Sequence, residues 1–431
     1  MDFPLPFPAI APDNDVMKRI ASDALPQSRF LDRRTAPHIF TLIMLAGVAA
    51  LAMNLFLPSM PAMARHFDVD YSVIQLAVSA YLALTGVLQL FIGPLADRYG
   101  RRPVLLCAIA VFTLASVGCV LAPNATMFLL FRFIQAIIAA ALVLSRAIIR
   151  DMVPAEEAAA MIGYVTTFMA LMPMLGPVAG GFLEQALGWQ ANFIVLALSG
   201  AALLLVLFFD LMETNPPKSG GFRDQIRSYP ELLTSRRFWG YSAIAAFSSG
   251  CFFVLLGGGP YVGSEVLGMQ PRDTGISFGI ISLGYMCGNY LTGRFARTAG
   301  LHRMMITGTV FSALGLILAL GLMLAGYVNA WTIFGPIFFV GFGNGLTLPS
   351  ANAGTLSVKP ELAGTASGLG GALAIGGGAV LSAVTGFFLG TGQSAFPLIL
   401  MMLFSATMSI LATLYTRRIE LQVSASQGSA S

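Results

Sequence analysis

Long apolar segments recur along the whole chain, and each is long enough, at about 20 residues, to cross a bilayer as a helix. Twelve of them lie at residues 39–57, 73–94, 104–122, 127–149, 161–183, 191–210, 239–262, 274–293, 303–326, 332–350, 363–388 and 395–415. Charged residues make up only 10% of the sequence, whereas soluble domains contain about 25%. We therefore predict an all-α membrane protein that crosses the bilayer twelve times.

The longest polar interruption, residues 211–238, separates six apolar segments from the next six. It contains Pro216, Pro217 and Gly220, which interrupt regular structure. The predicted organisation is a disordered cytoplasmic tail at 1–38, a six-helix bundle at 39–210, a cytoplasmic linker at 211–238, a second six-helix bundle at 239–415 and a cytoplasmic tail at 416–431.

Lysine and arginine are distributed unevenly between the two sides of the membrane. If the N-terminus lies inside, twenty-one of the 24 fall in cytoplasmic segments. Arg65 and Arg272 fall outside, and Arg132 falls within a span. Cytoplasmic loops carry an excess of these residues, so both termini are predicted to be cytoplasmic.

The stretch Gly93–Pro103, between the second and third apolar segments, concentrates four charges, at Asp97, Arg98, Arg101 and Arg102. Charges are costly in hydrocarbon, so the stretch is predicted to be a cytoplasmic loop. It resembles the G-x-L-A-D-R-x-G-R-R signature of the major facilitator superfamily (MFS). The resemblance implies two pseudo-symmetric six-helix bundles that alternate access to a central site.

The same resemblance implies that the loop is a conformational latch. Asp97 and the neighbouring arginines would meet the amino end of a helix in the other half, predicted at Leu362–Thr365, because a carboxylate is favoured there. The alternative is a loop that only orients the protein. A weaker repeat of this sequence pattern follows the eighth apolar segment and comprises Gly293, Arg294, Phe295, Arg297, Gly300 and Arg303.

Arg132 lies inside the fourth apolar segment with no acid near it in sequence. A buried arginine is costly and is therefore a candidate functional residue. With Gln135 it resembles the R-x-x-Q-G element of the family, which implies a part in proton coupling, although Ala136 replaces the glycine. Asp151 ends the same helix and is predicted to lie near the Asp97 loop; a solvated helix end is the alternative.

The fifth apolar segment resembles the antiporter motif of the family's exporters, through Gly163, Gly176, Pro177, Gly180 and Gly181. Glycine permits close helix approach and proline bends a helix. The motif implies export, while packing without functional meaning is the alternative. The predicted partner is the eighth segment, with the pairs Gly275/Gly279 and Gly284/Gly288.

The end of the first segment, Asn54–Pro61, resembles the D-x-Y-L-P-x-L-P element of the Bcr/CflA (bicyclomycin and chloramphenicol resistance) branch of drug:proton antiporters, as does Gly364–Leu369. Asn54 replaces an acid of that element, and an amide cannot carry a proton. The remaining candidates for proton coupling are Asp97, Asp151 and Glu184, all near helix ends. Neutral or anionic substrates are therefore expected in preference to dications.

The resemblance places the substrate cavity among helices one, four, seven and ten. An adaptable pocket combines apolar walls with a few polar anchors. The predicted substrate-binding residues are Asn54, Arg132, Gln135, Phe252, Phe253, Tyr261 and Asn344. The alternative for each aromatic residue is ordinary packing or contact with lipid.

Together these features favour a multidrug efflux transporter of the bacterial inner membrane, and not an enzyme. It would export small amphipathic, neutral antimicrobials of the phenicol or bicyclomycin type by proton antiport. The expected partners are the drug, protons and the bilayer, with no nucleic acid, metal or cofactor, and we expect a monomer. The alternatives are an exporter of a natural metabolite, such as a sugar, nucleoside or amino-acid derivative, and a receptor or scaffold with the same fold.

Overall fold

The computed structural model describes residues 28–153, 155–214, 229–359, 362–389 and 394–428. The first half contains α2 (Ile39–Asn54), η1 (Leu57–Ser59), α3 (Met60–Phe67), α4 (Tyr71–Tyr99), α5 (Arg101–Val120), α6 (Ala125–Ile134), η2 (Gln135–Ile138), α7 (Ala139–Met152), α8 (Ala155–Leu187) and α9 (Gln190–Asp210). The second half contains α11 (Arg236–Tyr261), η3 (Val262–Val266), α12 (Pro271–Ala299), α13 (Leu301–Leu324), α14 (Ala330–Phe334), α15 (Ile337–Ser357), α16 (Ala363–Leu389) and α17 (Phe396–Gly428).

Every element in the described ranges is a helix. Within these ranges, eleven helical segments are long and apolar enough to cross a membrane by length and composition. The twelfth helix of the bundle, α12, is 29 residues long. It contains more small and polar residues than the other eleven helices, and α8 and α15 pack against it. The predicted all-α fold of twelve long helices is confirmed. Most helices are longer than the predicted apolar segments, because their ends include polar residues on either side of each segment.

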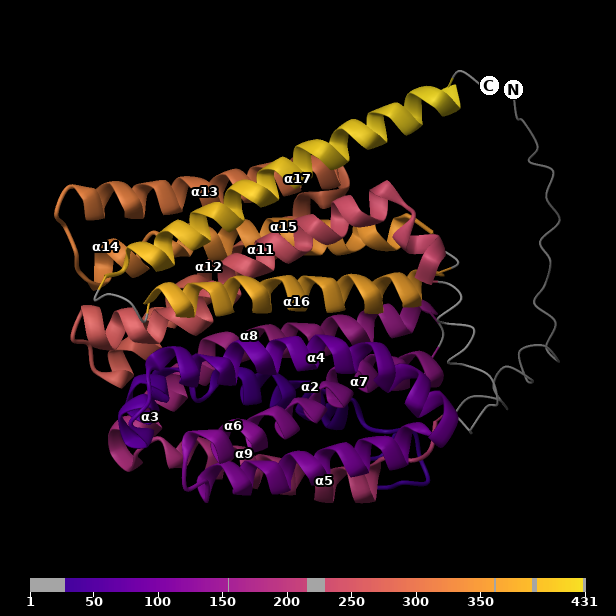
Figure 1. Ribbon diagram of the computed structural model, residues 1–431. Coiled ribbons are helices and arrows are strands. Elements are labelled where there is room, and N and C mark those ends of the chain that lie inside the picture. The colour runs from indigo at the N-terminus through magenta and orange to yellow at the C-terminus, as the bar shows by residue number, and fades with distance from the viewer. Residues whose placement is uncertain (1–27, 154, 215–228, 360–361, 390–393, 429–431) are drawn as a thin grey trace, which may run out of the picture.

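The two halves lie side by side and form separate groups of helices in Figure 1. Where they meet, α4 packs against α16, and α8 packs against α12. The second contact is close, since a Cβ at Gly181 would lie 2.5 Å from the carbonyl oxygen of Pro271. These two helix pairs form most of the boundary across which the halves contact each other.

Two tight loops at equivalent places show the internal repeat. Gly100 separates α4 from α5 with φ +94° and ψ 152°, and Gly300 separates α12 from α13 with φ +82° and ψ 152°. Both φ values are ones that glycine adopts without strain. In each loop the glycine N–H donates to the carbonyl four residues earlier, of Ala96 or Ala296. The repeated sequence pattern after α12 therefore has the same backbone geometry at its glycine as the stretch after α4.

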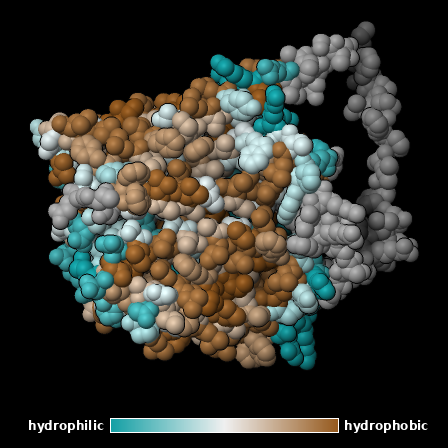
Figure 2. Space-filling view, in the orientation of Figure 1, coloured by the Kyte–Doolittle hydropathy of each residue, from teal (hydrophilic) through white to brown (hydrophobic). Residues whose placement is uncertain are grey.

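The surface carries a broad apolar band between two more hydrophilic ends (Figure 2). Leu114, Leu198 and Phe387 are at least 65% exposed, which suits contact with lipid chains. In Figure 1, α3 and α14 lie at one end of the molecule, and the C-terminal end of α17 lies at the other. The distribution of lysine and arginine makes the first end the outer one.

The described residues next to the termini make specific contacts. Residues 1–27 lie outside the described part, but Asp210 accepts hydrogen bonds from the backbone N–H of Leu31 (2.7 Å) and of His38 (3.0 Å). This carboxylate thus holds part of the predicted tail 1–38 at the cytoplasmic end of the first half. At the other terminus, α17 continues to Gly428 and so enters the predicted tail at 416–431.

Candidate functional site

Arg132 lies in the last turn of α6 and is completely buried. Its Nε donates to the carbonyl oxygen of Ala77 (3.1 Å), and its Nη1 donates to Oε1 of Gln135 (2.8 Å). The guanidinium carbon lies 3.8 Å from the ring centroid of Tyr81 and 4.4 Å from that of Phe56. Two hydrogen bonds and two cation–π contacts therefore hold the cation between α4 and the end of α2.

The guanidinium has no acidic partner among the described residues, whose salt bridges all involve other groups. Gln135 is oriented by a second bond, because its Nε2 donates to Oγ of Ser116 on α5 (2.7 Å). The Nη2 of Arg132 is buried without a hydrogen-bond partner. The site thus holds an uncompensated positive charge with one donor group free, which can bind a ligand oxygen or an anion.

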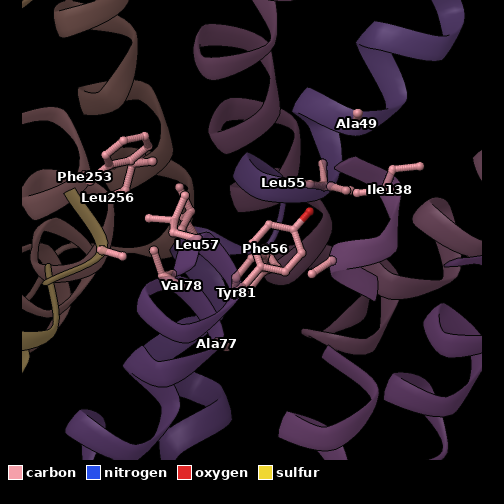
Figure 3. Close-up of a cluster of buried hydrophobic side chains, with 14 of the residues drawn as sticks. Ala49, Leu55, Phe56, Leu57, Ala77, Val78, Tyr81, Ile138, Phe253 and Leu256 are labelled. Atoms are coloured by element: carbon pink, nitrogen blue, oxygen red, sulfur yellow. The ribbon is translucent and has the colours of Figure 1, made fainter. Parts of the chain in front are cut away.

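The two rings that contact Arg132, those of Phe56 and Tyr81, belong to an apolar cluster that extends to the other half (Figure 3). Phe56 and Tyr81 lie together in the middle of the view. Phe253 and Leu256 of α11 approach them from the side of Leu57. The Arg132 centre therefore belongs to a continuous apolar cluster that spans the boundary between the halves.

Asn54 is buried, but its surroundings differ from those of Arg132. Its Nδ2 donates to the carbonyl oxygen of Ala50 in its own helix (2.7 Å), and its Oδ1 has no partner. A Cβ at Gly176 would lie 3.0 Å from the Cβ of Asn54. Asn54 therefore lies where α2 packs on α8, and its role in substrate binding stays a prediction.

Phe252, Phe253 and Asn344 come from the second half. The rings of Phe252 and Phe253 are 5.9 Å apart, and the Phe253 ring fills the space that a Cβ would need at Gly378 of α16. Asn344 is buried on α15. Phe253 is thus the member of this group that packs in the cluster shown in Figure 3.

Tyr261 lies near the outer end of the molecule, and its role in substrate binding stays a prediction. Its ring is 4.9 Å from that of Tyr71, and Tyr71 precedes Tyr81 by ten residues on α4, or about 15 Å along a helix. It lines an outer pocket of about 640 Å³ with Arg65 and Glu265. Tyr261 is the last residue of α11, so it would contact a substrate at the outer part of the predicted cavity.

The charged stretch where α4 meets α5 joins a network at the cytoplasmic end of the first half. Of the predicted loop Gly93–Pro103, only Gly100 lies outside these two helices. Arg101 Nη1 lies 3.1 Å from Oδ1 of Asp97, and its Nε donates to Oδ2 of Asp151 (2.9 Å). The predicted proximity of Asp151 to the Asp97 loop is confirmed. The contact of Asp97 with 362–365 stays a prediction, because the side chains of residues 363 and 364 are not described.

Glu213, which sequence reasoning missed, supplies a carboxylate at a helix N-terminus within this network. It accepts hydrogen bonds from the backbone N–H of Arg101 (2.8 Å) and of Arg102 (3.1 Å), the first residues of α5. These N–H groups have no partner within the helix. The residue follows α9 in a polar stretch, and no local pattern connects it with α5. Arg102 and Arg98 also lie over neighbouring rings, of Phe208 and Tyr99.

The glycines of the fifth span have three different environments. A Cβ at Gly180 would overlap the carbonyl oxygen of Leu55, whereas Gly181 faces Pro271 of α12. Gly163 has nothing within 4 Å of a Cβ position. The motif around Pro177 therefore brings α8 against α2 of its own half and against α12 of the other half.

The predicted partner of this motif is confirmed for one of the four glycines named on the eighth segment. A Cβ at Gly275 would overlap the carbonyl oxygen of Pro177. Gly284 and Gly288 instead face backbone atoms of Phe338 and Phe342 on α15. They lie on the side of α12 that packs against α15, so their assignment to α8 was wrong.

Glu184 lies near the end of α8, at the opposite end of the molecule from Asp97 and Asp151. Ser59 and Arg65 are its electrostatic neighbours, and its Oε2 is buried without a hydrogen-bond partner. The three acids predicted to take part in proton coupling are thus divided between the two sides of the membrane.

Residues 42–383 match the family described as the Major Facilitator Superfamily. YdgK of Bacillus subtilis, described as an uncharacterized MFS-type transporter, is 33% identical over 359 residues, which cover 80% of this chain and 88% of YdgK. Multidrug resistance protein D of Escherichia coli is 27% identical, over 85% of this chain and 93% of its own. A chloramphenicol resistance protein of Pseudomonas aeruginosa is 29% identical, over 74% and 76%.

A solved structure supports the same fold. It is described as a bacterial homolog to the human lysosomal transporter Spinster in an inward-facing and unoccupied conformation. It aligns with a TM-score of 0.68 at 17% identity and covers 88% of this chain and 95% of its own.

These matches confirm the resemblance to the resistance branch that the motifs at Gly93–Pro103, Gly176–Gly181 and Asn54–Pro61 predicted. They agree with the apolar band and the long helices, which make the chain a multi-pass membrane protein. The chain belongs to the Major Facilitator Superfamily and is a membrane transporter.

Proposed function

We propose that the protein exports small amphipathic, neutral antimicrobials of the phenicol or bicyclomycin type across the bacterial inner membrane by proton antiport. The observation that carries the proposal is the Arg132 centre, a buried cation whose partners are a carbonyl, an amide and two rings. Such a centre would not retain a dication. The names of two relatives, for multidrug and chloramphenicol resistance, support the choice of substrate class.

In this proposal, Arg132 orients the substrate and the apolar cluster provides most of the contact area. The unpartnered Nη2 donates to a carbonyl, hydroxyl or nitro oxygen of the drug. Because Arg132 is enclosed by Phe56 and Tyr81, one of these rings has to move before a ligand reaches it. Rings and aliphatic side chains accept amphipathic molecules of different shapes.

For proton coupling we propose the carboxylates of Asp97 and Asp151 on the cytoplasmic side and Glu184 on the outer side. Protonation of Asp97 or Asp151 would weaken its ion pair with Arg101. Glu184 has one buried oxygen free to hold a proton. Protons would therefore be taken up outside and released inside as the halves alternate.

The test is the accumulation of radiolabelled chloramphenicol in cells stripped of other efflux pumps. We expect several-fold lower accumulation in cells that express the protein, and a return to the control level after a protonophore is added. Equal accumulation in both strains, with the protein present in the membrane, would count against phenicols and favour a natural metabolite. Low accumulation that persists after the protonophore would contradict proton antiport.

A further inference from the structure

The polar side-chain contacts described between the two halves lie near their outer ends. They are the salt bridge of Arg65 Nη1 with Glu265 Oε1 (2.6 Å), the hydrogen bond from Tyr71 Oη to the carbonyl oxygen of Gly257 (2.7 Å), and the hydrogen bond from Gln75 Nε2 to the carbonyl oxygen of Ser382 (2.7 Å). The salt bridge is exposed to solvent, and exposed pairs contribute little. The buried contacts of α4 with α11 and α16 therefore contribute to the closure of this end, together with the packing of α8 on α12 at Gly181 and Pro271.

Gln75 reaches across the boundary between the halves. It belongs to α4 of the first half and is 1% exposed. Its carboxamide sits between two glycines of the second half: a Cβ at Gly257 of α11 would lie 2.6 Å from Nε2, and a Cβ at Gly386 of α16 would overlap Oε1. The two glycines thus form a hole that fits this side chain and leaves no space for a methyl group.

The closed arrangement leaves two polar atoms unpaired. Gln75 Oε1 and Ser382 Oγ are both buried without a hydrogen-bond partner. Unpaired buried polar atoms oppose the state that contains them. Opening of the outer end would return both atoms to water. The cost of burying them unpaired partly offsets the favourable packing of the carboxamide, which keeps the closure reversible.

We propose that Gln75 is the latch of the outer gate. Its carboxamide occupies the hole between Gly257 and Gly386 when the transporter is closed to the outside, and leaves it when the halves separate there. The inference rests on membership of the transporter family and not on the identity of the substrate.

The test measures the distance between the outer ends of the halves in the purified full-length protein. Nitroxide labels are placed at Asp70 and Gln270, which precede α4 and α12 and make no side-chain cap, after the four natural cysteines are replaced by serine. We expect Gly386→Ala to raise the ratio of the long to the short distance at least about tenfold. Gly376→Ala, on the same helix with nothing within 4 Å of its Cβ position, should leave the ratio unchanged.

The decisive comparison repeats Gly386→Ala in a Gln75→Ala background. Because the added methyl group then meets no carboxamide, we expect no further change in the ratio. An equal shift in both backgrounds, or none in either, would overturn the proposal. If Gly386→Ala does not yield folded protein, Gly257→Ala provides the comparison from the other wall of the hole. It is made with Ser382→Ala present throughout, because a Cβ at Gly257 would also meet Ser382 Oγ. No drug is required, so failure of the chloramphenicol experiment would leave this result interpretable.

Discussion

Replacement of Arg132 by methionine should reduce drug export at least tenfold, equivalent to about 1.4 kcal/mol of transition-state stabilisation, while the protein stays folded. Methionine fills a similar apolar space but removes the donor groups and the charge over the rings of Tyr81 and Phe56. Removing a buried charge also removes its desolvation cost, so stability should change little. The measurement is the initial efflux rate from preloaded cells at matched expression.

Two further variants test whether the loss of export is due to the Arg132 guanidinium. Arg272→Met makes the same change at an exposed arginine that lies over the Phe182 ring at 5.0 Å, and it should leave efflux unchanged. Arg132→Lys keeps the charge but loses the planar fork, and it should retain part of the activity. Wild-type efflux of every tested drug by Arg132→Met would refute the role of this centre.

The largest effect on stability is expected from Gly180→Ala. The new methyl group would overlap the carbonyl oxygen of Leu55, and no rotamer change can move a backbone atom. Overpacking costs about 1–3 kcal/mol, and occasionally more; here we expect at least the upper end of that range. The measurement is the thermal unfolding midpoint of the purified protein in detergent.

Gly163→Ala is the matched control on the same helix, because nothing lies within 4 Å of its Cβ position. Alanine is favoured over glycine in a helix by about 1 kcal/mol, so this variant should unfold at the same or a higher temperature. A wild-type midpoint for Gly180→Ala, or equal decreases for both variants, would contradict the close packing of α8 on α2.

The number and order of the long helices could be predicted because each bilayer crossing needs a long apolar segment. The ends of the helices could not be predicted, since α4 and α8 continue beyond their apolar segments and a polar composition does not distinguish helix from loop. The stretch Gly93–Pro103 was placed at the cytoplasmic face from its charges, but it was wrongly expected to be a loop, because α4 and α5 continue through it on either side of Gly100. Its partner Glu213 was not identified, because it lies more than a hundred residues away and its bonds are made by backbone groups of α5.

The Arg132 site shows the same limit. The charge in an apolar span identified the residue, and the spacing to Gln135, one helical turn, placed the two on one face. Tyr81, Phe56 and Ser116 come from other segments of the chain, and an aromatic ring in a membrane helix has no distinctive pattern. The contact of Tyr261 with Tyr71 could not be predicted either, because sequence does not fix which residues of α11 lie beside which residues of α4.

The most direct measurement of the central claim uses purified protein in vesicles with an acidic lumen and an enclosed pH-sensitive dye. Chloramphenicol added outside should raise the lumenal pH faster in vesicles with the wild-type protein than in empty vesicles or in those with Arg132→Met, because drug entry is exchanged for proton exit. Equal rates in wild-type and empty vesicles, with the protein shown to be folded, would contradict proton-coupled export of this drug.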